Sequence, residues 1–368
     1  MIDRDQVMQV INSLEDPEIK RPLMEMGMIR NLEITDDTVS MTVVLTIQGC
    51  PLKSMIQEET AAKLKAVSGV KHVNIEWGSM NGQERAELSQ RLRGPQKKSP
   101  FLTGETAARI IGVASGKGGV GKSTVTVNLA VSLGKLGYKV GVIDADIYGF
   151  SVARMLGMLS RPVILDNNMI MPMARHGIRA ISMGNLVDEG QPIVWRGPML
   201  GKMLEQFLAD VYWGELDYLL LDLPPGTGDM ALSVQQMMPK SEILLVTTPQ
   251  AAAANVAQRV AGFAEKTGQH LIGVVENMAY FVCPHCSEKT AIFGEGGGER
   301  IAKGAGTELL GRLPLTPAVR EGGDEGTPIV TADPESPAAK AFMELAERVV
   351  KTSQADTGVR YLSLGTEA

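Results

Sequence analysis

Residues 109–136 have the sequence RIIGVASGKGGVGKSTVTVNLAVSLGKL, and this stretch decides the fold. The apolar run Ile110–Ala114 predicts a buried strand, and the apolar spacing over Ser123–Leu136 predicts a helix. Between them, Gly116–Thr124 satisfies the pattern G-x-x-x-x-G-K-[ST], whose glycines let successive N–H groups point at phosphate oxygens. The positive end of the following helix adds to the attraction for phosphate. The stretch therefore predicts a nucleoside triphosphate site between a strand and a helix.

Two side chains of this loop have predicted roles in ATP binding. Lys122 should bridge the β and γ phosphates, and Ser123 should ligate Mg²⁺. The residues expected to contact the nucleotide are Gly116, Gly118, Gly119, Val120, Gly121, Lys122, Ser123 and Thr124.

From residue 107 onward, short apolar strands alternate with helices. Runs such as Tyr218–Leu221 are apolar on both faces, which is typical of strands covered by helices on both sides. The predicted fold class is therefore α/β, a doubly wound and mostly parallel sheet, with a last amphipathic helix over Pro337–Lys351. Gly296–Gly298 lack a following Lys-Ser/Thr, so we expect a flexible turn there. Strands are expected at Ile110–Ala114, Lys139–Asp144, Ile178–Ser182, Tyr218–Leu223, Glu242–Thr247, Leu271–Glu276 and Glu308–Pro314.

The first 80 residues follow a different pattern, that of a small α+β domain. Residues 81–106 are polar and contain Pro95 and Pro100, as a linker would. The predicted organisation is the small domain at 1–80, a linker at 81–106, the nucleotide-binding domain at 107–355 and a tail at 356–368. In the small domain, helices are expected at Gln6–Leu14 and Leu52–Val67, and strands at Ile29–Ile34, Val39–Thr46 and Lys71–Trp77.

Composition narrows the classes of partner. The 368 residues include 36 basic and 42 acidic side chains, for a formal net charge of -6, which argues against nucleic acid. Residues 1–5 (MIDRD) do not resemble a secretory signal, and no stretch approaches the roughly 18 apolar residues of a membrane span. The presence of only three cysteines excludes a disulfide scaffold. We therefore expect a cytoplasmic protein with neither nucleic acid nor membrane as its partner.

Three aspartates lie at the predicted carboxyl ends of strands. Asp144 and Asp146 follow the second strand of the nucleotide-binding domain, and Asp222 ends the strand that begins at Tyr218. Ligands of open parallel sheets bind at this edge. A single aspartate at a strand end is usually a cap or turn residue, but three in register with a phosphate loop favour function. Asp222 is placed as a Walker B carboxylate is, and 224–229 (PPGTGD) resembles a loop that senses γ-phosphate.

The sequence Cys283-Pro284-His285-Cys286 is a second chemical centre. A thioredoxin-type pair would open a helix after a first βα unit, which this pair does not. A structural zinc site needs four ligands, but His285 lies between the two thiolates and Cys50 belongs to another predicted domain. A four-thiolate site therefore needs two chains, and four thiolates hold a [4Fe–4S] cluster. Zinc that bridges two chains remains an alternative on ligand count alone.

Several motifs together resemble the Mrp/ApbC family of iron–sulfur cluster carrier ATPases over nearly all of residues 107–350. The first 80 residues resemble the small iron–sulfur assembly domain that is often fused ahead of such proteins, through Asp16–Glu18 and Thr46–Pro51. That resemblance makes Cys50 a candidate transient ligand, and a small buried thiol is the alternative. The motifs are Gly116–Thr124, Asp144–Gly149, Asp222–Asp229, the pair Cys283 and Cys286, Ile292–Gly298 and Val319–Asp324.

The resemblance also implies residue roles. With Lys117 at its front, the loop resembles the deviant Walker A subgroup, in which this lysine reaches the partner's phosphates across a nucleotide-sandwich dimer; a solvated loop lysine is the alternative. By the same resemblance Asp146 orients the attacking water, Asp144 lies nearer Mg²⁺ and Asn277 contacts adenine. From the residues alone, Asn277 would be a turn former. The implied catalytic residues are thus Lys117, Lys122 and Asp146.

The implied function is a homodimer that binds and slowly hydrolyses ATP and delivers a [4Fe–4S] cluster to apo iron–sulfur client proteins. Cys283 and Cys286 would hold the cluster. Ser123, Asp144 and Asp222 would form the Mg²⁺ site. Alternatives are a MinD/ParA-like positioning ATPase, a cluster-dependent reductase and a non-catalytic scaffold. Phe150 stands where the family usually has proline, which affects only the detail of the nucleotide switch.

Overall fold

The computed structural model describes residues 2–17, 21–46, 53–84, 87–88, 99–147, 149–165, 169–186, 197–226, 229–250, 262, 269–283, 285–286 and 288–355. The chain divides into two compact units. Unit 1 contains residues 1–103, 161–174 and 206–214, and unit 2 contains residues 104–160, 175–205 and 215–368. The linear boundaries expected at 80, 106 and 355 stay predictions. Cys50 lies outside the described residues.

Unit 1 contains a three-stranded sheet in the order β1-β2-β3, with β1 and β2 antiparallel and β2 and β3 parallel. The side chain of Asp3 accepts hydrogen bonds from two N–H groups of the first helix, which explains where that helix begins. The helices and strands predicted for the first 80 residues are all present, with small shifts at their ends. They are α1 (Arg4–Asn12), β1 (Ile29–Thr35), β2 (Thr38–Leu45), α2 (Lys53–Lys65) and β3 (His72–Ser79), followed by the short α4 (Pro100–Thr103).

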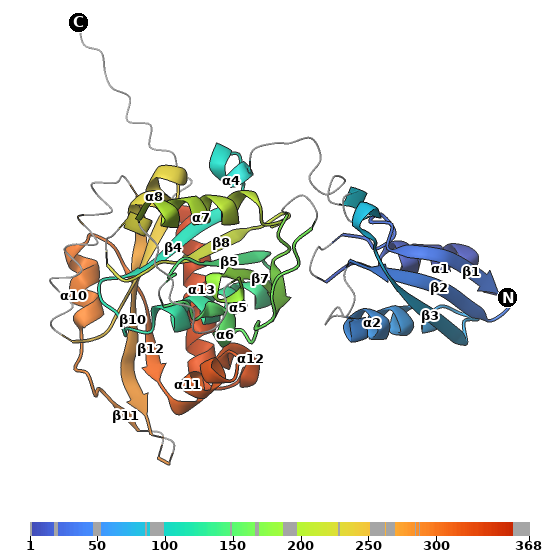
Figure 1. The fold of residues 1–368 in the computed structure, drawn as a ribbon. Helices are drawn as coiled ribbons and strands as arrows, with labels where there is room; N and C mark the ends of the chain where they lie inside the picture. The colour runs from blue at the N-terminus through green and yellow to red at the C-terminus, as the bar shows by residue number, and fades with distance from the viewer. Residues whose placement is uncertain are drawn as a thin grey trace, which may run out of the picture. The chain divides into compact units, whose positions relative to one another are not determined.

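Among the residues that the structure describes, the larger sheet has nine strands in the order β11-β10-β9-β4-β8-β5-β7-β6, with β12 paired to β10 (Figure 1). The pairs that β4, β5, β9 and β12 form with their neighbours are parallel, and β11 runs antiparallel to β10. This confirms the predicted α/β fold with a mostly parallel sheet. The strands are β4 (Arg109–Ser115), β5 (Val140–Asp144), β6 (Met173–Arg175), β7 (Ile178–Ser182), β8 (Tyr218–Asp222), β9 (Glu242–Thr247), β10 (His270–Val282), β11 (Lys289–Thr290) and β12 (Leu309–Leu315).

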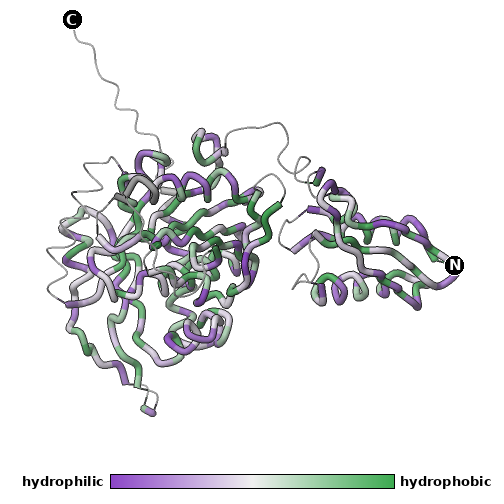
Figure 2. Tube along the Cα trace, in the orientation of Figure 1, coloured by the Kyte–Doolittle hydropathy of each residue, from purple (hydrophilic) through white to green (hydrophobic). Residues whose placement is uncertain are grey.

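Helices cover both faces of this sheet: α5 and α13 lie on one side, and α7 and α8 on the other (Figure 1). Leu219, Leu220 and Leu221 of β8 are fully buried, as two covered faces require. Figure 2 shows hydrophobic residues concentrated along the central strands. Among the described residues, no helix has the length and apolar character needed to cross a bilayer. The helices are α5 (Lys122–Lys135), α6 (Val152–Met155), α7 (Gly197–Ala209), α8 (Asp229–Met237), α10 (Gly297–Gly304), α11 (Pro317–Asp324), α12 (Ile329–Ala332) and α13 (Pro337–Ala355).

Strand β10 is longer than predicted, because the sequence pattern indicated only Leu271–Glu276. Beyond that point Asn277 looked like a turn former, and the next residue, Met278, has a φ of +56°. The strand nevertheless continues, because Phe281 pairs with Leu315 of β12 on one side and with Thr290 of β11 on the other. These partners come from later in the chain, so a local pattern could not reveal them.

The triple glycine Gly296–Gly298 does not form the flexible turn that we predicted. Gly296 has a φ of +72° and caps α10, whose first residues are Gly297 and Gly298. A Cβ on Gly297 would lie 2.3 Å from the carbonyl oxygen of Pro249, and one on Gly298 would lie 2.7 Å from Cβ of Glu276. The glycines therefore let the start of α10 lie directly against the segment that follows β9 and against the middle of β10.

Gly297→Ala should destabilise the protein, because the new methyl group meets backbone that must move. We expect the free energy of unfolding to fall by about 1–3 kcal/mol. Gly304→Ala, near the other end of α10, is the matched control, since a Cβ there meets nothing within 4 Å. It should be neutral or stabilising by up to about 1 kcal/mol. Urea denaturation of both variants checks this, and equal effects would contradict it.

Candidate functional site

The phosphate loop joins β4 to α5, in the context that its sequence predicted. Gly119 and Gly121 have φ values of +76° and +78°, in the left-handed region that favours glycine. Gly121 is the N-cap of α5, and no side chain of the described residues caps this helix. Its first N–H groups are therefore available to an anion.

An open cavity of about 250 Å³ lies over the loop. It is at the carboxyl ends of the parallel strands, where ligands bind in open α/β sheets. A Cβ on Gly118 or Gly119 would meet nothing within 4 Å, so the loop backbone faces open space. The lining residues are Ser115, Gly118, Gly119, Val120, Gly121, Lys122, Ser123, Thr124, Asp146, Gly149, Ser151, Met155 and Pro225.

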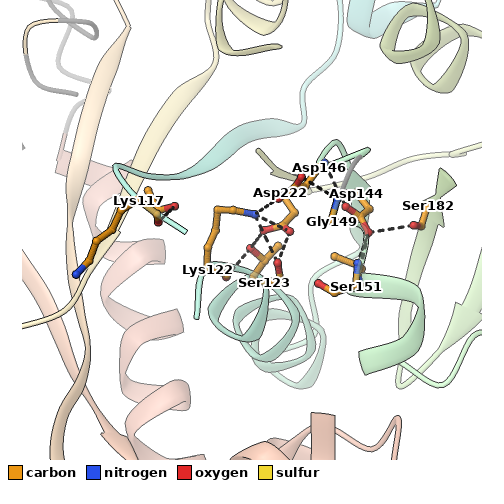
Figure 3. A network of polar contacts seen from close by, with 12 residues as sticks. Lys117, Lys122, Ser123, Asp144, Asp146, Gly149, Ser151, Ser182 and Asp222 are labelled. Carbon is orange, nitrogen blue, oxygen red and sulfur yellow. Dashed lines mark hydrogen bonds and ion pairs between the residues drawn. The ribbon is translucent and has the colours of Figure 1, made fainter. Parts of the chain in front are cut away.

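Asp222 is the buried anion of the site. Its carboxylate has no solvent exposure, and Lys122 Nζ lies 2.8 Å from its Oδ2. The hydroxyl of Ser123 donates to the same oxygen at 2.6 Å, and that of Thr126 donates to Oδ1 at 2.7 Å (Figure 3). All three donors belong to α5, so Asp222 connects β8 to the first turns of the helix.

Ser123 Oγ and Asp222 Oδ2 together fit a magnesium ion. Both are hard oxygen donors, the class that Mg²⁺ prefers, and they lie beside each other under the loop. The structure thus brings together two of the three predicted ligands.

Asp144 is also fully buried, but its partners differ. Oδ2 accepts hydrogen bonds from the N–H groups of Ser151 at 3.0 Å and Val152 at 3.1 Å, and from the hydroxyl of Ser182 at 3.0 Å. These contacts connect β5 to the start of α6 and to β7. Burial, and then the negative charge of Asp222, raise the pKa of Asp144 to about 7. Its contacts are those of an anchor for the adjoining loop, and its role near Mg²⁺ stays a prediction.

Asp146 lines the cavity beside Lys122. Its Oδ2 lies 3.8 Å from Lys122 Nζ, and the N–H of Gly149 donates to its Oδ1 at 3.2 Å. Burial raises the pKa of Asp146, while the charge of Lys122 opposes the shift. The carboxylate therefore lies at the cavity beside Lys122, and its role in orienting the attacking water stays a prediction.

Lys117 points away from Lys122 and from the cavity of its own chain (Figure 3). Its Nζ donates a hydrogen bond of 2.8 Å to Oε1 of Gln250, which also accepts from the hydroxyl of Thr248. Sequence reasoning missed Gln250, because nothing local connects the end of β9 with the front of the loop.

Asn277 is buried behind the loop. Its Nδ2 donates to the carbonyl oxygen of Val120 at 2.8 Å, and a Cβ on Gly121 would lie only 2.2 Å from the same nitrogen. Asn277 thus supports the loop backbone. The contact with adenine that we inferred for it stays a prediction.

Cys283 and Cys286 lie at the tip of the β10–β11 hairpin. Both are free thiols; Cys283 is half-buried and Cys286 is exposed. The N–H of Cys283 donates to the carbonyl oxygen of Glu288 at 3.0 Å, which closes the hairpin. Backbone N–H groups of Cys286 and His285 lower the pKa of the Cys283 thiol. The thiolate, which is the form that binds metals, is thereby favoured.

In the part of the chain that the structure describes, no three His, Cys, Asp or Glu side chains lie grouped as metal ligands.

Comparison with known proteins identifies the family. Residues 106–350 match the family described as NUBPL iron-transfer P-loop NTPase, and residues 4–77 match the family described as iron–sulfur cluster assembly protein. The chain belongs to the NUBPL iron-transfer P-loop NTPase family. The resemblance inferred from the motifs is thereby confirmed.

Relatives of this NTPase agree with the assignment. The iron–sulfur cluster carrier protein of Mycobacterium leprae is 45% identical over 96% of this chain and 93% of its own length. A nucleotide-binding protein from Archaeoglobus fulgidus, solved in complex with ADP, is 36% identical, with a TM-score of 0.57 over 67% of this chain and 98% of that chain. The cell division ATPase MinD of Pyrococcus furiosus is 27% identical, with a TM-score of 0.52 over 66% and 99%.

The raised pKa of Asp144 predicts a pH dependence of stability. The folded protein holds this proton more tightly than the unfolded chain, whose pKa is near the ordinary 3.8. The free energy of unfolding therefore falls as the pH rises from about 4 to about 7 and then levels off. Asp144→Asn removes this titration, so the stability of the variant relative to wild type should rise between about pH 4 and about pH 7. Urea denaturation of the nucleotide-free protein measures this, and a pH-independent difference would contradict it.

Proposed function

We propose that this chain is an ATP-hydrolysing carrier that holds an iron–sulfur cluster between two copies of itself and transfers it to apo iron–sulfur proteins. The observation that carries the proposal is the placement of two thiols, one with a lowered pKa, in the hairpin directly after the strand that supports the phosphate loop. Membership of an iron-transfer NTPase family and the name of the Mycobacterium leprae relative support it.

The cluster is the cargo, and Cys283 and Cys286 are its proposed ligands. One chain supplies two thiolates here, and a [4Fe–4S] cluster takes four. Two copies that meet at the hairpin tips would complete the set. Exposure of Cys286 supports this arrangement, because the thiols are accessible to a second copy and to an accepting apoprotein.

The proposed roles at the nucleotide follow the geometry of the cavity. Lys122 would contact the β and γ phosphates, and Asp146 would orient the attacking water. Ser123 and Asp222 would hold Mg²⁺, which supplies positive charge to the phosphates. Lys117, which points away from its own cavity, would act on the partner's nucleotide.

Anaerobic reconstitution should load about four irons for each pair of chains. Cys283→Ala and Cys286→Ala should abolish iron binding and leave ATP binding intact, because both thiols lie outside the cavity lining. His285→Ala is the control between them: a four-thiolate cluster tolerates it, whereas a zinc site that uses this imidazole does not. Counts of iron, sulfide and zinc decide the outcome, and unchanged iron in Cys283→Ala would refute the cluster site.

Lys122→Ala should spare cluster loading and block transfer, because the residue lies in the nucleotide cavity and not at the hairpin. Transfer to an apo-ferredoxin, followed by circular dichroism with and without ATP, checks this. Cluster transfer by Lys122→Ala at the wild-type rate would contradict the prediction, because it would show that transfer does not require the nucleotide site.

Lys117 allows a test of the dimer. Lys117→Ala and Asp146→Ala should each abolish hydrolysis when alone. If Lys117 acts on the partner's nucleotide, mixing the two variants restores one complete site in each mixed pair, or about a quarter of wild-type activity. No recovery in a mixture shown to exchange chains would place Lys117 in its own site.

The likeness to MinD favours one second candidate, an ATPase that positions other molecules. That function predicts ATP-dependent sedimentation with liposomes or DNA, and no iron after reconstitution. The two measurements therefore separate it from the carrier.

A further inference from the structure

Two consecutive residues of β10 contact different parts of unit 2. Asn277, with 5% of its surface exposed, donates from its side chain to Val120 in the phosphate loop. Glu276 has 1% of its surface exposed, and its Oε1 accepts the N–H of Gly298 at 2.7 Å, at the start of α10. Successive side chains of a strand point to opposite faces. The middle of β10 is therefore held between the phosphate loop on one side and α10 on the other.

Met278 follows with a left-handed backbone, which is unfavourable for a residue with a side chain. The pairing of β10 with β12 also shifts register here, between Glu276 and Tyr280. The strand is thus irregular directly beyond Asn277. Backbone of this kind persists only where its surroundings hold it in place, and here those surroundings include the phosphate loop.

Past this irregularity β10 runs to Val282, and Cys283 comes next. At about 3.3 Å per residue, the stretch from Asn277 to Cys283 spans roughly 20 Å. The path from the loop to the thiols therefore consists of one side-chain hydrogen bond and one length of strand.

We infer that Asn277 is the positioning residue that couples the phosphate loop to the cysteine hairpin. A nucleotide that moves the backbone at Val120 moves its hydrogen-bonded partner Asn277. The irregular backbone at Met278 lets the rest of β10 shift together with Asn277. This shift changes the position of Cys283 and the groups around its thiol. The biological use of this coupling rests on the proposed carrier function, but the coupling itself requires no cluster.

The test measures the reactivity of the thiols in the reduced, cluster-free full-length protein. Cys50→Ser removes the third thiol of the chain from the background. The rate of Cys283 alkylation by iodoacetamide is read by peptide mass spectrometry, without nucleotide and with saturating ADP or a non-hydrolysable ATP analogue plus Mg²⁺. In the parent protein, nucleotide should change this rate by about two- to tenfold, the range that one hydrogen bond supports.

Asn277→Ala should lose this response even at nucleotide concentrations that saturate the variant, as measured by isothermal calorimetry. Asn277→Asp keeps the shape of the side chain but presents an acceptor to the carbonyl oxygen of Val120, so this variant should lose the response as well. It provides the test if the alanine variant does not fold. Glu276→Gln is the matched control. It changes the neighbouring side chain on the opposite face and retains an acceptor for Gly298, so the response should persist.

A full nucleotide response in a folded Asn277 variant would overturn the inference, as would its absence from a parent protein that binds nucleotide. A loss of response in Glu276→Gln equal to that in Asn277→Ala would also overturn it, since general loosening of β10 would then explain both. Failure of the carrier proposal has a different signature, because a chain that never binds iron can still show the response.

Discussion

The nucleotide site depends on the buried carboxylate of Asp222. Removing a charge from water costs several kcal/mol unless partners replace its hydration. Here the replacement comes from Lys122, Ser123 and Thr126, which are three donors on one helix. The same contacts fix α5 against β8, so the helix presents its first N–H groups, and the loop before them, at the edge of the sheet. The contacts that stabilise the buried charge of Asp222 are therefore the same contacts that fix the position of the phosphate loop.

A second constraint is close packing behind the loop. Gly121 and Asn277 are so near that no side chain fits between them, and Gly297 lies equally near Pro249. Glycines at these points let the phosphate loop lie directly against the side chain of Asn277 and let α10 lie directly against the backbone of Pro249. Close-packed elements of this kind move together, because none has free space to move alone. The cysteine hairpin is the continuation of one of them.

The local sequence pattern predicted much of the fold and of the phosphate loop. The strand, loop and helix at residues 109–136 were correct, because each feature depends on neighbouring residues. Thr126 could have been found as well, since it lies one helical turn after Ser123 and so shares its face. Ser182 could not, because its contact with Asp144 depends on β7 lying next to β5 in register. The extension of β10 was missed for the same reason, since its pairing partners come later in the chain.

The sequence by itself determined that the chain binds a nucleotide and has two thiols spaced for a metal. Both properties are held within short contiguous segments, where backbone conformation and residue spacing are set locally. Only the tertiary structure decided that Asn277 supports Val120, that Asp144 anchors the start of α6, and that Lys117 points out of its own cavity. The order and register of parallel strands arise from packing between distant segments, and this packing determined which residues meet around the phosphate loop.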